Sequence, residues 1–116
     1  MKTYKDLLVW QMACDFTTKI YRITNSFPHN EIYGLTSQLR RASVSIASNL
    51  AEGSKRGKKE FCQFIKIAQG SGAETETQLI VAKNIGYIKQ KEFTELTNEL
   101  DSIMKMLTNL LKKIGI

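Results

Sequence analysis

The sequence has little of the residue types on which most enzymes and secreted proteins depend. Its 116 residues include one histidine, one proline and two cysteines, and no apolar run is longer than a few residues. A transmembrane helix needs about 20 consecutive apolar residues, so none is predicted. The first ten residues carry several charges and lack the apolar stretch of a signal peptide. We therefore expect a cytoplasmic protein.

The single histidine, His29, follows Pro28 in a predicted loop. Nucleophilic and acid–base sites that use histidine would have to recruit it from there. The chain also lacks the Glu-x-x-His pairs of di-iron bundles and the Walker A motif of nucleotide-binding loops. Glu52, Glu74 and Glu76 could in principle bind a metal, but they are better explained as partners of Arg and amide side chains. We expect no catalytic residue, metal site or cofactor, and hence no enzyme.

Cys14 and Cys62 are far apart in the sequence and outside any Cys-x-x-Cys spacing. Two such cysteines are more typical of reduced core residues than of a disulfide or a redox pair. A hydrophobic content of 42% and a net charge of +6 suit one folded, basic domain.

Apolar residues recur at three- and four-residue spacing through four segments, which predicts four helices. These helices cover residues 3–25, 34–53, 58–85 and 91–114, and no segment alternates as a strand would. Short connections between long helices predict an all-α, antiparallel up-down four-helix bundle that occupies residues 1–116 as one domain. The fourth segment has the clearest apolar seam: Phe93, Leu96, Leu100, Ile103, Leu107, Leu110 and Ile114.

Two segments make specific packing predictions. In the first, one apolar stripe includes Tyr21 and a second includes Phe16, so this helix is expected to contact neighbours on more than one side. In the third, Gly70 and Gly72 interrupt the pattern, although glycine weakens a helix interior. Glycine at that level predicts a close approach between two helices.

The fourth segment carries a second apolar edge at Met104, Met106 and Leu111. One seam is enough to bury a helix in a bundle, so the additional edge predicts contact with another copy of the chain. We therefore expect an oligomer.

Positive charge is concentrated in the second quarter of the chain, where residues 31–60 hold six basic and three acidic residues. Four of the six, Lys55, Arg56, Lys58 and Lys59, lie at the predicted turn between the second and third helices. This cluster could contact nucleic-acid phosphates without reading sequence, or it could be an ordinary solvated helix junction. No aromatic residues are interleaved with it, which argues against a site that stacks single-stranded bases. Supporting basic residues are Lys19, Arg22, Lys66, Lys112 and Lys113.

The same turn determines which residues of the second and third helices lie level with each other. Folding back around Gly57 places Arg41 level with Glu74. We expect an Arg41–Glu74 ion pair inside the bundle, which leaves Arg40 facing outward as a further nucleic-acid contact. The predicted polar layer around the pair contains Gln38, Ser45, Asn49 and Gln78.

Three stretches together resemble one known family. They are YGLTSQLRRASVSIASNLAEGS (33–54), KKEFCQFIKIAQGSGAETETQL (58–79) and IGYI (85–88). In these stretches the chain is similar to the bacterial four-helix bundle proteins encoded in intervening sequences of 23S ribosomal RNA genes. The accessory variability proteins of diversity-generating retroelements belong to the same wider group.

The resemblance implies a barrel-shaped homopentamer with a positively charged surface that binds nucleic acid, and no enzymatic activity. In retroelement members it also implies contact with a reverse transcriptase. This chain departs from the family pattern at three positions: it has Ala47 in place of Pro, and Gly72 and Thr75 in place of Leu. Ala47 should leave the second helix straight, while Gly72 and Thr75 should loosen its packing against the third.

Two functional hypotheses follow. The first is a non-enzymatic, oligomeric bundle that binds RNA or an RNA–DNA complex as an accessory or scaffold protein, repeating the cluster at residues 55–59 around one rim. The second is an oligomeric protein-interaction module whose charge serves solubility. The expected partners are nucleic acid, further copies of the chain and a reverse transcriptase or other protein, with no membrane.

Overall fold

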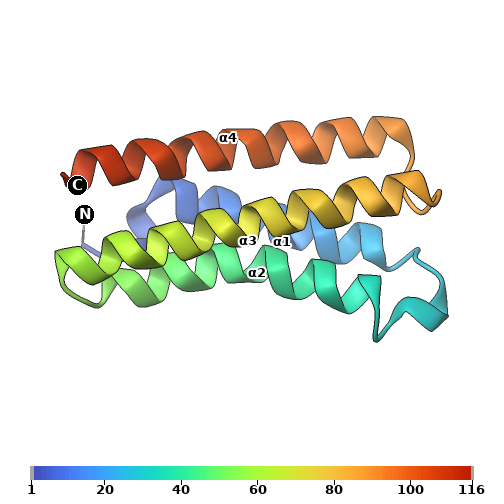
Figure 1. Cartoon of the computed structure of the whole chain (residues 1–116), viewed down its shortest axis with the longest axis horizontal. Coiled ribbons are helices and arrows are strands. Elements are labelled where there is room, and N and C mark those ends of the chain that lie inside the picture. The colour runs from blue at the N-terminus through green and yellow to red at the C-terminus, as the bar shows by residue number, and fades with distance from the viewer. Residues whose placement is uncertain (1, 116) are drawn as a thin grey trace.

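The computed structural model describes residues 2–115 and contains four long helices: α1 (Leu8–Thr24), α2 (Leu35–Ser54), α3 (Lys58–Asn84) and α4 (Gln90–Ile114). No strand occurs within the described range, so the all-α prediction is confirmed. Figure 1 shows the helices side by side along an axis of 42 Å, with the chain reversing direction at each connection. Each helix packs against the next in sequence, and α1 also packs against α4. The α2–α3 side and the α1–α4 side are therefore opposite faces of the bundle.

The helix boundaries lie close to the predicted ones except at the N-terminus, where the first helix begins at Leu8 and not at residue 3. The preceding residues form a separate 3-10 turn, η1 (Tyr4–Asp6). The Thr3 hydroxyl accepts from the Lys5 N–H at 2.9 Å, and the Asp6 carboxylate accepts from the Thr3 N–H at 3.1 Å. This reciprocal cap closes the turn, and Leu7 then adopts an extended conformation that separates it from α1.

The buried face of α4 matches the predicted seam, because Leu96, Leu100, Ile103 and Leu107 are all buried. In α1, however, the core-facing stripe is the one that contains Phe16, which is fully buried. The other stripe is only partly exposed, because Tyr21 is 44% exposed whereas Thr17 and Thr24 are buried. Helix α1 thus packs against both α2 and α4, as predicted. The buried apolar residues of α1 and α2 are Val9, Ala13, Phe16, Ile20, Leu39, Ala42, Ile46, Ala47 and Leu50.

The close helix approach predicted at the α3 glycines occurs at one of them. A Cβ atom at Gly72 would lie 2.3 Å from the Met104 sulfur, whereas one at Gly70 would meet nothing within 4 Å. Gly72 therefore packs against α4, which corrects the expectation that it affects packing against α2. Met104 is partly buried in this contact. The second apolar edge of α4, which predicted an oligomer, is thus partly used within the chain.

Other sequence predictions concern single residues. Both cysteines are free thiols, with Cys62 buried and Cys14 partly buried, and burial raises the pKa of the Cys14 thiol. Helix α2 continues without a break through Ala47. Among residues 2–115, no helix is long and apolar enough to cross a membrane.

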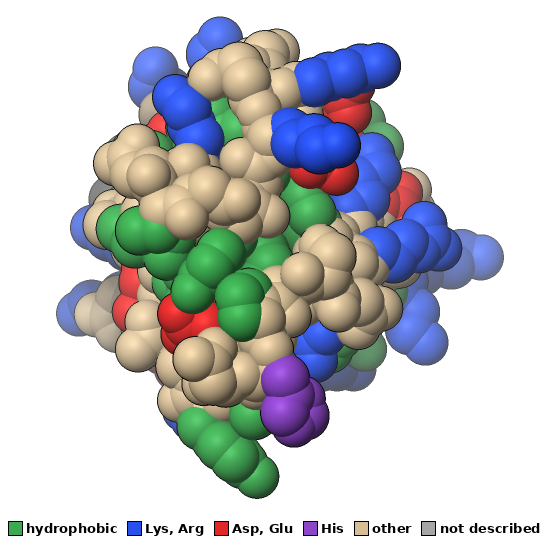
Figure 2. Space-filling view, turned by 90° about the vertical axis from the view of Figure 1, so that its right-hand side faces the viewer, with side chains coloured by type: hydrophobic (Ala, Val, Ile, Leu, Met, Phe, Trp, Pro, Cys, Tyr) green, Lys and Arg blue, Asp and Glu red, His purple; other side chains and the backbone are tan. Residues whose placement is uncertain are grey.

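The end of the bundle far from the termini is joined by contacts between its two loops. The Tyr87 hydroxyl donates to a Glu31 oxygen at 2.8 Å, and the Leu35 N–H donates to the other Glu31 oxygen at 3.2 Å. These hydrogen bonds, the first above all, lower the pKa of Glu31. The Tyr87 and Phe27 ring centres lie 5.2 Å apart. Figure 2 views this end, where hydrophobic side chains gather near the middle of the surface.

Candidate nucleic-acid interface

The predicted basic turn between α2 and α3 lies at the same end of the bundle as both termini (Figure 1). Contacts connect these three segments. Lys55 Nζ lies 5.8 Å from the centre of the Tyr4 ring. The ammonium group of Lys58 lies beside Gly115, 3.6 Å from where a Cβ atom would stand. The fold thus brings the first, middle and last segments of the chain together.

This convergence makes the positive cluster larger than the sequence indicated. The four predicted cations of the turn, Lys55, Arg56, Lys58 and Lys59, are all exposed. Exposed lysines from the terminal segments join them, and we call the whole set the basic end: Lys2, Lys5, Lys55, Arg56, Lys58, Lys59, Lys112 and Lys113. The prediction treated Lys112 and Lys113 only as supporting residues and missed Lys2 and Lys5. The even number of antiparallel helices was the available signal, because it returns both termini to the level of the middle turn.

Three acidic residues at this end, Asp6, Glu52 and Glu60, offset only part of the charge of the eight basic residues. Asp6 is occupied in capping η1, where backbone N–H groups lower its pKa. Glu52 lies 3.7 Å from a guanidinium nitrogen of Arg56, and that guanidinium also lies 5.1 Å from the centre of the Phe64 ring. Contacts of this kind hold the stem of a basic side chain against the protein while its charge stays accessible to water.

The roles predicted for the two adjacent arginines of α2 are reversed. Arg40, expected to face outward, is partly buried and stacks over the Tyr21 ring at 4.7 Å. Its guanidinium donates to Thr24 Oγ1 at 2.9 Å, to Asn25 Oδ1 at 3.0 Å and to the Tyr21 carbonyl at 3.4 Å. Arg40 therefore caps the C-terminus of α1, where a cation also complements the helix dipole. Its predicted contact with nucleic acid stays a prediction.

Arg41, expected inside the bundle, is exposed, as is Glu74. The predicted register is correct in that both residues line one groove between α2 and α3. The predicted ion pair is absent, because the ion pairs within residues 2–115 are Lys19–Glu99 and Arg56–Glu52. Water reaches both charges in an open groove, so a close pair would contribute little.

The polar layer predicted around Arg41 and Glu74 is therefore a solvent-accessible groove rather than an internal layer. Asn49 donates to the Ser45 carbonyl at 2.7 Å, and Ser45 donates to the Arg41 carbonyl at 2.8 Å. Both side chains thus bond to their own helix and not across to α3. The groove occupies about 540 Å³, and its lining residues are Tyr33, Ser37, Gln38, Arg41, Ala42, Ser45, Glu74 and Gln78.

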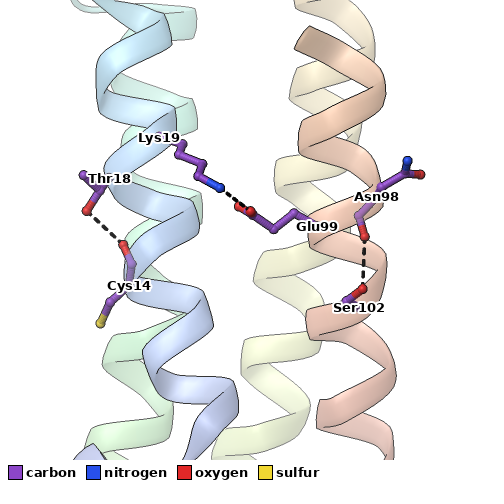
Figure 3. A network of polar contacts seen from close by, with 6 residues as sticks. All are labelled: Cys14, Thr18, Lys19, Asn98, Glu99 and Ser102. Carbon is purple, nitrogen blue, oxygen red and sulfur yellow. Dashed lines mark hydrogen bonds and ion pairs between the residues drawn. The ribbon is translucent and has the colours of Figure 1, made fainter. Parts of the chain in front are cut away.

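A second hollow lies on the opposite face, between α1 and α4. Lys19 of α1 reaches across it to Glu99 of α4 with a nitrogen–oxygen distance of 2.5 Å (Figure 3). This contact raises the pKa of Lys19, first through the hydrogen bond and then through the charge of Glu99. We call this hollow the α1–α4 cleft. It has a volume of about 360 Å³, and its lining residues are Lys19, Arg22, Ile23, Glu92, Glu95, Leu96 and Glu99.

Among residues 2–115, no group of three or more His, Cys, Asp or Glu side chains could hold a metal ion.

Comparison with known proteins gives a match in fold and family. The bundle is similar to the crystal structure of a protein with unknown function from the S23 ribosomal protein family of Bacteroides thetaiotaomicron VPI-5482, with a TM-score of 0.81 and 22% identity. The match covers 90% of this chain and 99% of that one. No curated protein matches the sequence. The family model described as "23S rRNA-intervening sequence protein" matches residues 5–109. Together with the four packed helices, this match shows that the chain belongs to the 23S rRNA-intervening sequence protein family.

Proposed function

We propose that this protein is a non-enzymatic, oligomeric bundle that binds nucleic acid through its basic end and acts as an accessory or scaffold in an RNA or RNA–DNA complex. The observation that carries the proposal is the convergence of eight exposed basic residues, from three segments distant in sequence, on one end of the bundle. A charged surface of this kind suits the regularly spaced phosphates of a nucleic-acid backbone.

The mode of binding follows from the residue types at that end. Lys and Arg contact phosphates as charges, and these contacts position a nucleic acid without reading its bases. The turn residues Lys55, Arg56 and Gly57 include no aromatic side chain, and the nearby rings of Tyr4 and Phe64 are partly buried beside the Lys55 and Arg56 cations. We therefore expect binding that depends strongly on salt and weakly on sequence.

Self-association would multiply these contacts. We propose a homopentamer, in agreement with the resemblance described above. Large apolar side chains on α3 and directly after it support self-association, because Ile67, Ile80, Val81 and Ile85 are each more than 40% exposed. If five copies present their basic ends on one rim, the four turn cations alone supply 20 positive charges. A long nucleic acid could then bind several weak sites at once, which raises its overall affinity.

The proposal is tested by measuring the affinity for labelled RNA and DNA across a salt series. One variant changes Lys55, Arg56, Lys58 and Lys59 to Ser. A matched control changes four lysines outside the basic end that were given no role in binding, Lys83, Lys89, Lys91 and Lys105, to Ser. Both variants lose four of the positive charges that give the wild type its net charge of +6. The comparison therefore separates the position of the charge from its total.

We expect wild-type affinity to fall steeply with salt and the control to behave nearly like wild type. In the turn variant, the slope of log K against log salt should become shallower by up to about 3 for single strands, if all four residues contact phosphates. Absence of binding at low salt, or equal losses in the two variants, would contradict the proposal. In that case an oligomeric protein-interaction module becomes the better hypothesis for the function.

A further inference from the structure

A small pocket lies beside the loop between α1 and α2, at the end of the bundle that Figure 2 views. It has a volume of about 130 Å³, which is space for roughly four water molecules. We call it the loop pocket, and its polar lining residues are Thr24, Asn25, His29, Thr36 and Arg40. Within residues 2–115 no acidic side chain lines it. A cation and several hydrogen-bonding groups without a carboxylate suit an anionic ligand.

The acidic residue of the same loop is already engaged elsewhere. Glu31 accepts hydrogen bonds from the Tyr87 hydroxyl and from the Leu35 N–H. Its carboxylate is therefore held by the neighbouring loop and by the start of α2, and it forms no ion pair with Arg40 among the described residues.

Arg40 lines the pocket with part of its guanidinium unpaired. Its three hydrogen bonds to the end of α1 use Nε and Nη2, and Nη1 has no partner within residues 2–115. The side chain thus keeps its charge and the two N–H groups of Nη1 beside the pocket, while α1 fixes its position. An arginine held in this way loses little further freedom when it binds an oxyanion.

The buried hydroxyl of Thr36 is a second, independent sign of a ligand. Thr36 is 4% exposed, and its Oγ1 has no hydrogen-bond partner within residues 2–115. Buried polar groups normally find a partner, and leaving one unpaired is costly. Threonine in a helix populates two χ1 rotamers, so rotation about one bond can present this hydroxyl to a ligand in the pocket. Thr36 also lies in the first turn of α2, where the helix dipole favours an anion.

The available donors distinguish a phosphate group from a carboxylate. A carboxylate is bound best by two parallel N–H groups of one guanidinium, and the Nε and Nη2 groups of Arg40 are occupied by α1. The remaining donors come from separate residues: Arg40 Nη1, the Thr36 hydroxyl and the exposed His29 of the 3-10 turn η2 (His29–Glu31). Separate donors suit the several oxygens of a tetrahedral phosphate. The volume admits one such group and excludes a nucleoside.

We propose that the loop pocket binds a single phosphate group, which is either inorganic phosphate or the terminal phosphate of a nucleotide or nucleic-acid strand. The phosphate accepts from Arg40 Nη1 and from the Thr36 hydroxyl, and His29 contacts it from the exposed side. The pocket and the basic end lie at opposite ends of the bundle (Figure 1), so the two sites are separate. This inference therefore does not depend on the proposed function of the basic end.

Titration with inorganic phosphate tests the proposal. The wild type is compared with the variant in which Lys55, Arg56, Lys58 and Lys59 are changed to Ser, because phosphate could also collect at the basic end. Binding is followed by NMR through the Thr36 amide and the Arg40 side-chain signals, with chloride at equal ionic strength as the control. We expect saturable shifts in both proteins and none with chloride. Signals that do not move, or that move equally with chloride, would overturn the proposal.

The hydroxyl is tested by Thr36→Val, which keeps the shape of the side chain. The matched control is Thr75→Val, since Thr75 is fully buried in α3 and its hydroxyl donates to the Ser71 carbonyl at 2.8 Å. We expect Thr36→Val to weaken phosphate binding about fivefold and Thr75→Val to leave it unchanged. Arg40→Lys, which keeps the charge without the planar guanidinium, should weaken it roughly tenfold. Equal affinities in the wild type, Thr36→Val and Arg40→Lys would contradict the assigned contacts.

Urea unfolding in phosphate-free buffer gives a second readout on the same variants. Thr36→Val should raise the midpoint, because an unpaired buried hydroxyl is removed, whereas Thr75→Val should lower it, because a bonded hydroxyl is removed. A Thr36→Val midpoint below that of the wild type would mean that the hydroxyl has a partner in the protein, and it would overturn the proposal.

A final comparison identifies the source of the phosphate. A strand with a terminal phosphate is compared with the same strand ending in a hydroxyl, in competition with inorganic phosphate. A preference for the phosphorylated strand that is lost in Thr36→Val assigns the pocket to strand ends. Equal binding of the two strands, with saturable binding of inorganic phosphate, assigns it to small phosphate compounds. Failure of the salt series at the basic end leaves either result intact.

Discussion

Three glycines inside helices make a direct test of how tightly the bundle is packed. A Cβ atom at Gly70 would meet nothing within 4 Å, one at Gly72 would lie 2.3 Å from Met104 Sδ, and one at Gly53 would lie 2.5 Å from Phe64 Cβ. None of the three has a positive φ, so none requires glycine for its backbone conformation. Replacing each with Ala therefore adds the same methyl group to three different environments.

At Gly70 the substitution has a helix-propensity effect and no steric cost. Alanine is favoured over glycine in a helix interior by about 1 kcal/mol, chiefly because it restricts the unfolded chain. We expect Gly70→Ala to raise the free energy of unfolding by about 1 kcal/mol and the Tm by roughly 4 °C. This variant is the reference for the other two.

At Gly53 the same gain is opposed by a contact that cannot relax easily. The Cβ of Phe64 is fixed to the backbone of α3, so relief requires the two helices to separate. Overpacking of this kind typically costs about 1–3 kcal/mol, and a separation of 2.5 Å between carbons lies at the severe end. We expect Gly53→Ala to lower the free energy of unfolding by about 1–2 kcal/mol. At Gly72 the obstructing atom is near the end of a flexible side chain, so Gly72→Ala should fall between the other two.

The assay is urea unfolding followed by far-UV circular dichroism, at one fixed protein concentration because association would shift the midpoint. The predicted order of stability is Gly70→Ala, then Gly72→Ala, then Gly53→Ala. Equal stabilities for the Gly70 and Gly53 variants would contradict this order, because they would mean that α2 and α3 can separate at little cost.

Further predictions concern the core, the α1 cap and the loop contact. Leu107→Ala should cost about 2–5 kcal/mol in urea unfolding, because Leu107 is fully buried and its removal leaves a cavity. Arg40→Ala should cost about 1–3 kcal/mol by the same assay, since Thr24 and Asn25 lose a charged donor; no loss would show that the cap is dispensable. The Glu31 carboxylate has a lowered pKa in the folded state, so its contribution to stability is complete above the unfolded value of roughly 4.3 and is lost as pH falls through the folded value. Tyr87→Phe should lower the Tm at pH 7 and weaken this acid dependence in thermal melts; an unchanged pH profile would assign the dependence to other groups.

Much of the fold could be predicted because helical periodicity is a local property of the chain. The spacing of Leu96, Leu100 and Ile103 defines one face of α4 whatever that face contacts, and it is buried as predicted. The start of α1 could not be predicted from periodicity, because the Thr3 and Asp6 side chains compete for the same backbone groups. The depth to which each stripe of α1 is buried also depends on the tertiary structure, since both stripes are apolar enough to contact a neighbouring helix.

At the candidate site, the charges of the turn from Lys55 to Lys59 could be predicted, because a helix junction with four cations remains exposed in any packing. The register that places Arg41 level with Glu74 could be predicted as well. Packing determines which of Arg40 and Arg41 is engaged by the protein, because adjacent side chains in a helix point about 100° apart and the local pattern does not say which of the two directions faces α1. The tertiary structure alone also brought Lys2, Lys5, Lys112 and Lys113 to the basic end, since residues so distant in sequence become neighbours only when four antiparallel helices pack together.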